Sequence, residues 1–154
     1  MKAELQDRIV AIVNDEIILY SEFSKELKIA REFDADVTGE DVLQEMINQL
    51  LILDKARKFR ITTSAYGQSR AKDEQSIIKE YIDVRLRGFI HVPYEDIEYY
   101  YYQNEDSYSG KELYDVRDEI EDYLIERELS IKLLEYVEEL KRNSYIRIQL
   151  NVDS

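Results

Sequence analysis

The first twenty residues combine two short β-branched runs. Residues 8–13 (RIVAIV) and 16–20 (EIILY) are rich in isoleucine and valine, and Asn14-Asp15 separates them. Asparagine and aspartate tolerate the left-handed backbone that a tight turn between antiparallel strands needs. The pattern therefore predicts a β-hairpin over residues 8–20.

Helical spacing of apolar residues follows the predicted hairpin. Ser21 can cap a first helix that ends near Phe33-Asp34. Thr38-Gly39-Glu40-Asp41 resembles a capping box, with aspartate in place of the usual glutamate, and predicts the start of a second helix. The apolar positions of this second helix cover more than half of its circumference, which predicts a central place in the fold. They are Val42, Leu43, Met46, Ile47, Leu50, Leu51, Leu53 and Ala56.

The middle of the chain is the least regular part. Residues 61–76 are polar and contain Gly67, so a loop and an exposed helix both remain open there. Apolar spacing resumes at Ile78 and predicts a third helix that includes Phe89. His91-Val92-Pro93 is expected to end it, because the residue before proline avoids helical backbone.

A tyrosine-rich fourth helix is predicted after this proline. Ile97, Tyr100 and Tyr101 fall on one face, and Tyr99 and Tyr102 point elsewhere. Helical spacing favours core packing for Tyr100 and Tyr101. Seven of the thirteen tyrosines fall within about twenty residues, and tyrosine suits contact with varied partners because it joins a large apolar body to a polar tip.

The remaining apolar residues predict one long helix and a last strand. The helical stripe runs from about residue 111 to residue 142, which gives a length of about 48 Å. Residues 145–150 (YIRIQL) alternate like a half-buried strand that can join the N-terminal hairpin. The predicted fold is mainly α with a small antiparallel β-sheet, a long C-terminal helix as its spine, and one domain over residues 1–154.

Composition and charge narrow the possible functions. The 154 residues carry a net charge of −13, which repels nucleic acid and anionic lipid surfaces. No run of 18 apolar residues is present, so we expect no membrane insertion. The chain has no cysteine and only one histidine, His91, which excludes thiol catalysis and the common multi-histidine metal sites. We therefore expect no metal and no cofactor.

Four segments together resemble the SurA-type periplasmic chaperone family. They are DRIVAIVNDEIILYSEF, VLQEMINQLLILDKARKFRIT, YIDVRLRGFIHVPYEDIEYYYYQNEDSY and VRDEIEDYLIERELSIKLLEYVEELKRNSYIRIQL. The resemblance covers residues 7–60 and 77–150. It implies a split core, in which an N-terminal part over residues 7–106 is completed by the C-terminal helix and strand of residues 111–150.

The sequence departs from that family where a parvulin-type prolyl isomerase domain is usually inserted. Here the chain runs from Tyr101 to the last helix through only about ten residues. The isomerase activity cannot be carried over, so we expect no enzymatic activity. The segment between Ile61 and Ile78 is also short, which puts in doubt any client-binding surface that the family builds there.

The resemblance implies a non-catalytic holdase in the periplasm, with its signal peptide removed, that binds unfolded exported or outer-membrane proteins. An apolar, tyrosine-rich surface would hold these clients, although core packing remains an alternative for Tyr99, Tyr102 and Tyr108. A structural or assembly protein, forming a fixed homodimer or one specific complex, is the competing interpretation. A homodimer formed by exchange of terminal elements is also possible. The candidate client-binding residues are Tyr94, Tyr99, Tyr102, Tyr108, Met46, Phe89 and Ile90.

Overall fold

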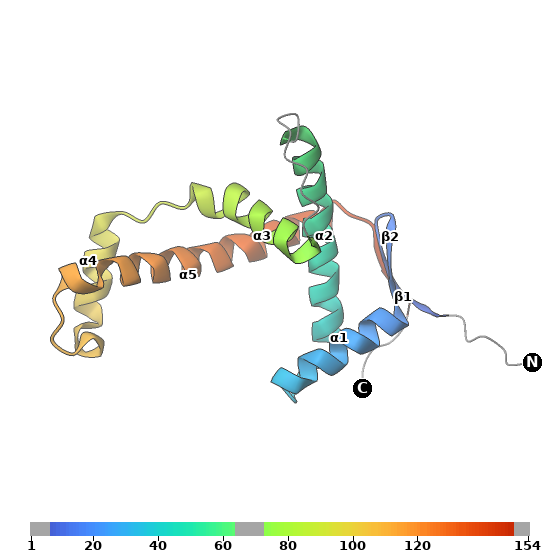
Figure 1. Cartoon of the computed structure of the whole chain (residues 1–154), viewed down its shortest axis with the longest axis horizontal. Coiled ribbons are helices and arrows are strands. Elements are labelled where there is room, and N and C mark those ends of the chain that lie inside the picture. Colours follow the sequence, from blue (N-terminus) through green and yellow to red (C-terminus); the bar gives the residue numbers. More distant parts are fainter. Residues whose placement is uncertain (1–6, 64–72, 150–154) are drawn as a thin grey trace, which may run out of the picture. The chain divides into compact units, whose positions relative to one another are not determined.

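The computed structural model describes residues 7–63 and 73–149 and consists mainly of helices with one small sheet (Figure 1). This confirms the fold class predicted from the sequence. The elements are β1 (Ile9–Val13), β2 (Glu16–Leu19), α1 (Tyr20–Phe33), α2 (Gly39–Thr63), α3 (Glu74–Arg85), η2 (Arg87–Phe89), α4 (Tyr94–Gln103), η3 (Glu105–Tyr108), α5 (Leu113–Arg142) and β3 (Ile146–Ile148). Of residues 61–76, where the sequence leaves loop and helix both open, 61–63 end α2 and 74–76 begin α3, and residues 64–72 lie outside the described residues.

The chain forms two compact units. Unit 1 contains the described residues up to Ile78 and those from Val137 onward, and unit 2 is Lys79–Tyr136. The long helix α5 supplies residues to both units, since its Val137 and Leu140 are buried in unit 1. The single domain expected over residues 1–154 stays a prediction.

The sheet of unit 1 joins the two ends of the chain. Its strand order is β2-β1-β3, and β1 pairs antiparallel with both neighbours. Ile12 lies opposite Ile17 on one side and opposite Arg147 on the other. Figure 1 shows the red C-terminal strand returning to the blue hairpin. The expectation that residues 8–20 and 145–150 share one sheet is confirmed up to residue 149, the last one described.

Asn14 fastens the hairpin turn to the start of β3. Its φ of 53° is left-handed, which asparagine tolerates better than most residues. Its backbone N–H donates to the Tyr145 carbonyl at 2.8 Å, and its side-chain oxygen accepts from the Tyr145 N–H at 3.0 Å. The side-chain amide also donates to the Ser144 hydroxyl at 3.3 Å. One residue thus supplies both the turn and the contact between the two ends.

The helix α2 starts as the capping-box pattern predicts. The Thr38 N–H and hydroxyl donate to the Asp41 carboxylate at 3.1 and 2.6 Å, and the Asp41 N–H donates back to the Thr38 hydroxyl at 3.1 Å. The helix then packs against α1 and β1. Its Leu43, Ile47 and Ala56 are fully buried, in agreement with the predicted central position.

The prediction that Ser21 caps α1 is wrong. The helix begins at Tyr20 with Leu19 as its N-cap, two residues earlier than a Ser21 cap implies, and Ser21 lies in its first turn. Instead, the Asp7 carboxylate accepts hydrogen bonds from the Ser21 hydroxyl and from the Ser21 N–H, while Glu22 accepts from the Leu19 N–H at 3.0 Å. A carboxylate just before the hairpin therefore does what a serine cap would do, and local sequence gives no sign of that contact.

The third helix ends earlier than its apolar spacing predicts. It stops at Arg85, and residues 87–89 form the short 3₁₀ turn η2. Glycine costs about 1 kcal/mol more than alanine within a helix, so Gly88 disfavours continuation. As a result Phe89 does not join a buried helix face, and 76% of its surface is exposed.

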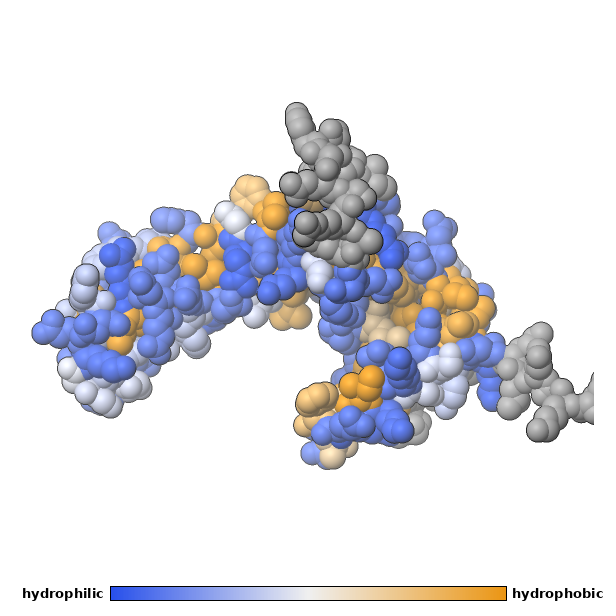
Figure 2. Space-filling view, viewed as in Figure 1, coloured by the Kyte–Doolittle hydropathy of each residue, from blue (hydrophilic) through white to orange (hydrophobic). Residues whose placement is uncertain are grey.

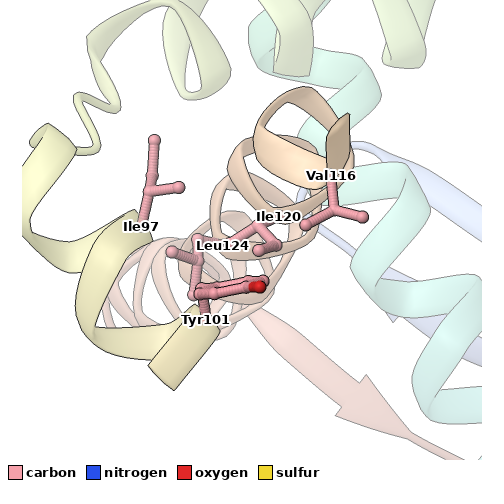
Figure 3. Packing of buried hydrophobic residues seen from close by; sticks show 5 residues of the cluster. All are labelled: Ile97, Tyr101, Val116, Ile120 and Leu124. Atoms are coloured by element: carbon pink, nitrogen blue, oxygen red, sulfur yellow. The ribbon is translucent and has the colours of Figure 1, made fainter. Parts of the chain in front are cut away.

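A small apolar cluster holds α4 against α5 in unit 2 (Figure 3). Tyr100 and Tyr108 are partly buried and pack against it. The Tyr101 hydroxyl donates to the Lys111 carbonyl at 2.6 Å, which closes the connection between the two helices. The predicted face of Ile97, Tyr100 and Tyr101 is confirmed. The cluster consists of Ile97, Tyr101, Val116, Ile120 and Leu124.

We expect Ile120→Ala to lower the free energy of unfolding by about 2 to 5 kcal/mol, because the change removes buried methyl groups and leaves a cavity. Ile120 has no exposed surface, whereas Leu134 on the same helix is 69% exposed. Leu134→Ala is therefore the control, and its unfolding free energy should change by about 0.5 kcal/mol or less. Urea unfolding followed by circular dichroism measures both. Equal losses of unfolding free energy in the two variants would contradict the assignment of Ile120 to the buried cluster.

Asn14 permits a second stability test. Asn14→Ala should lower the unfolding free energy by about 2 to 3 kcal/mol, since it loses hydrogen bonds and strains a left-handed position. Asn14→Gly keeps the backbone freedom and loses only the side-chain bonds, so about 1 to 2 kcal/mol is expected. If the alanine variant unfolds at the urea concentration of the parent, the attachment of β3 does not depend on Asn14.

Candidate functional site

One candidate binding surface is a half-open groove in unit 1, which we call groove 1. Its volume is about 690 Å³, and residues of β2, α1, α2 and the beginning of α3 line it. More than half of the lining residues are apolar. They are Ile17, Ile18, Ile29, Ala30, Val37, Val42, Met46, Leu50, Leu53 and Ile78.

Part of this apolar lining is open to solvent. Ile17 of β2 is 46% exposed and Ile29 of α1 is 39% exposed, whereas Ile18, Val42 and Leu53 are buried. In Figure 2, apolar surface lies over α1 and beside the strands, bordered by hydrophilic residues. Groove 1 thus has a buried apolar floor and accessible apolar walls.

Acidic side chains border groove 1. Among the lining residues that the structure describes, Lys25 is the single cation. Arg57 outside the lining pairs with Glu16 at 3.9 Å and with Glu74 at 3.0 Å. Hydrogen bonds from the Thr38 hydroxyl and N–H hold the pKa of Asp41 below its ordinary value, so this group remains ionised at neutral pH. The six carboxylates are Glu16, Glu22, Glu26, Asp41, Glu45 and Glu74.

A second groove, groove 2, lies within unit 2. It has a volume of about 590 Å³, and exposed aromatic residues and both signs of charge line it. Lys132 lies 3.7 Å from Glu128, so two of its charges are already paired. The lining residues are Phe89, Ile90, His91, Val92, Asp96, Tyr99, Tyr100, Leu124, Arg127, Glu128 and Lys132.

Four of the seven predicted client-binding residues line a groove. Phe89, Ile90 and Tyr99 come together in groove 2, where Tyr99 is 68% exposed. Met46 lines groove 1 in the other unit. The structure therefore brings together three of the predicted residues and puts the fourth in a different surface.

The other three predicted residues line neither groove. The Arg117 guanidinium lies over the Tyr94 ring at 5.5 Å from its centroid. Tyr102 is 58% exposed and meets the Tyr101 ring edge-on at 5.3 Å, whereas Tyr108 stacks on Tyr101 at 5.6 Å. Of the two alternatives for Tyr108, client contact and core packing, the structure shows core packing.

Sequence reasoning missed the exposed isoleucines and the acidic border of groove 1. Ile17 lies in a predicted strand and Ile29 lies within a predicted helix, and the local pattern marks neither as an exposed contact residue. Helical spacing does put Glu22 and Glu26, and likewise Asp41 and Glu45, on one side of their helices. This spacing identifies a binding surface only when it is known that these sides of α1 and α2 face a common groove with β2.

One buried tyrosine and two partly buried tyrosines of unit 2 have altered acid–base properties. Burial disfavours the phenolate and raises the pKa of Tyr100, Tyr101 and Tyr108. The neighbouring Tyr123 ring, 5.2 Å from Tyr100, raises the Tyr100 pKa further. These shifts reflect the packing of the cluster, and their direction does not activate a phenol at neutral pH.

The described residues contain no group of three histidine, aspartate or glutamate side chains placed to hold a metal ion. None of the helices in these parts of the chain is long and apolar enough to cross a membrane. A scan against models of protein families and a search of the curated proteins both find no match. The resemblance to SurA-type chaperones therefore rests on the sequence segments alone.

Unit 2 should lose stability at alkaline pH. A tyrosine with a raised pKa in the folded state holds its proton more tightly there than in the unfolded chain. The contribution of this group to the stability of the folded state is complete below about pH 10, and it is lost as the pH rises through the pKa of the folded state. Parallel titrations of tyrosinate absorbance and circular dichroism should show loss of helix accompanying the late ionisations.

Two phenylalanine variants test the cause of this alkaline loss. Tyr108→Phe removes a partly buried ionisable group and should retain its helices to a higher pH than the parent. Tyr114 on α5 is almost fully exposed, so Tyr114→Phe should follow the parent curve. The same alkaline midpoint in all three proteins would contradict the assignment of the alkaline loss of helix to ionisation of Tyr108.

Proposed function

We propose that this protein is a non-catalytic holdase that binds apolar segments of unfolded proteins in groove 1. The observation that carries the proposal is the accessible apolar lining that β2, α1 and α2 contribute to one open groove. Apolar contacts are not directional, so such a surface accepts many sequences and needs no cofactor. The volume of about 690 Å³ lies within the range of ligand-binding clefts.

The expected binding energy suits transient holding. Burying about 200 Å² of apolar surface contributes about 5 kcal/mol, and the cost of association offsets much of it. Each client segment is then held weakly and released readily. Met46 adds an adaptable side chain to the lining, because methionine has three rotatable bonds and a polarizable sulfur.

The resemblance to the SurA-type family supports a more specific form of this proposal. In that form the clients are unfolded exported or outer-membrane proteins, and the protein works in the periplasm. The competing function, a fixed homodimer or one specific complex, uses the same apolar surface for a single partner. Binding to several unrelated unfolded proteins favours the holdase, and binding to one favours an assembly factor.

A double variant of groove 1 tests the proposal. Ile17→Thr with Ile29→Gln removes two accessible apolar walls while respecting the strand and helix positions of the two residues. We expect the unfolding free energy to stay within about 1 kcal/mol of the parent. Protection of two unrelated, chemically unfolded clients against aggregation, followed by light scattering, should require roughly tenfold more protein.

The matched control removes one isoleucine and one other large apolar side chain outside groove 1. Ile148→Thr with Phe33→Gln changes an exposed isoleucine of the same sheet and an exposed phenylalanine of α1. This control should protect clients as well as the parent does. A further comparison is Tyr99→Ala with Tyr102→Ala in unit 2. If that pair abolishes protection and the groove 1 variant does not, the assignment to groove 1 is wrong.

A further inference from the structure

We propose that groove 1 selects amphipathic client segments that carry lysine or arginine beside apolar residues. This inference rests on the proposed holdase function and names the class of segment that the same groove prefers. Its basis is the combination of an apolar floor with a border to which the described residues contribute six carboxylates and one ammonium group. A neutral apolar segment can bury its side chains against the apolar floor only. A basic amphipathic segment can also pair its cations with the carboxylates of the border.

The carboxylates are arranged as two rows. Glu22 and Glu26 lie four residues apart on α1, and Asp41 and Glu45 lie four residues apart on α2. Side chains at this spacing share one side of a helix, and both pairs line groove 1. The rows accompany apolar lining residues on the same two helices, among them Ile29 and Met46.

These rows are not neutralised by the protein itself. In the described part of the chain Glu22, Glu26 and Glu45 form no ion pair, and Asp41 accepts only from Thr38. Two like charges four residues apart destabilise a helix. A bound cationic side chain relieves that repulsion in both rows, which is a gain that a neutral or acidic segment does not provide.

The whole-chain charge alone does not account for this arrangement. Groove 2 has both signs of charge, with Arg127 and Lys132 beside Asp96 and Glu128. Among its described lining residues groove 1 has one cation against six anions, and Arg57 outside the lining pairs with only two of these, Glu16 and Glu74. Selectivity for basic segments is therefore expected at groove 1, and Glu26 and Glu45 are the carboxylates best suited for testing it, since neither caps its own helix.

The test uses short fluorescent peptides that alternate leucine with a second residue, namely lysine, serine or glutamate. A fourth peptide alternates lysine with serine and has no apolar residue. Fluorescence anisotropy at low salt should give the tightest binding for the leucine–lysine peptide, about tenfold tighter than for leucine–serine. Raising the salt concentration should remove most of this difference, because the border is exposed and salt screens it.

The protein variants separate local from general charge effects. Glu26→Gln with Glu45→Gln should weaken the leucine–lysine peptide by about threefold to tenfold and leave the leucine–serine peptide unchanged. Unchanged binding of the serine peptide also shows that the groove is still folded. The control, Glu32→Gln with Glu40→Gln, removes two exposed carboxylates of the same helices outside groove 1 and should leave both peptides unchanged.

Several results would overturn the inference. Equal binding of the lysine and serine peptides, lost together in Ile17→Thr Ile29→Gln, would leave the holdase proposal standing and remove the charge selectivity. Binding of the lysine–serine peptide as tight as that of leucine–lysine would assign the effect to charge alone. Failure of every peptide would remove both proposals. A homodimer that dissociates only when groove 1 is mutated, and that peptides do not displace, would assign the groove to a second copy.

Discussion

The meeting of the two chain ends in one sheet is the constraint on which unit 1 depends. The central strand β1 has partners on both sides only when β3 returns from a point about 130 residues later in the chain. Closing a loop of this length costs roughly 4 kcal/mol of entropy, and a two-stranded hairpin alone is marginal. The hydrogen bonds of Asn14, and the bond from the Gln149 N–H to the Val10 carbonyl at 2.8 Å, oppose this cost. Because β2 is held by β1 and lines groove 1, the proposed binding surface depends on the same closure.

Groove 1 combines exposed apolar side chains with neighbouring carboxylates, which a closed hydrophobic core would not have. A closed core would bury Ile17 and Ile29 and would keep Glu26 and Glu45 away from apolar side chains. Here the exposed apolar walls and the carboxylates occupy the same surface. Apolar burial would supply most of the binding free energy for a client. The acidic border would select between clients, because each exposed charge contributes little binding free energy alone but charges of one sign add together. In unit 2 part of the tyrosine-rich segment is used for its own core, as the stacking of Tyr108 on Tyr101 illustrates, while Phe89 and Tyr99 stay exposed in groove 2.

The sequence predicts the elements well where local chemistry determines them. The hairpin at Asn14-Asp15, the Thr38–Asp41 cap and the buried face of Ile97 and Tyr101 all follow from residues close together in the chain. The two failures have different causes. The Asp7 carboxylate that replaces the expected Ser21 cap lies 14 residues away in the chain, whereas Gly88 is a local signal against helix that the apolar spacing up to Phe89 outweighs in the prediction. The candidate site is still harder to predict, because it depends on which sides of α1 and α2 approach β2. Only Met46 among the seven predicted residues lines groove 1. The tyrosines that lie close in sequence do meet in space, but Tyr102 and Tyr108 contact Tyr101 and line neither groove.

The measurement that tests the central claim most directly is hydrogen–deuterium exchange of the full chain with and without an excess of an unfolded client. If groove 1 holds the client, exchange should slow in β2, in α1 around Glu26 and Ile29, and in α2 around Asp41–Met46, and it should be unchanged around Phe89 and Tyr99. Protection confined to the segments around Phe89 and Tyr99, or no protection at a client concentration where aggregation is suppressed, would contradict the account.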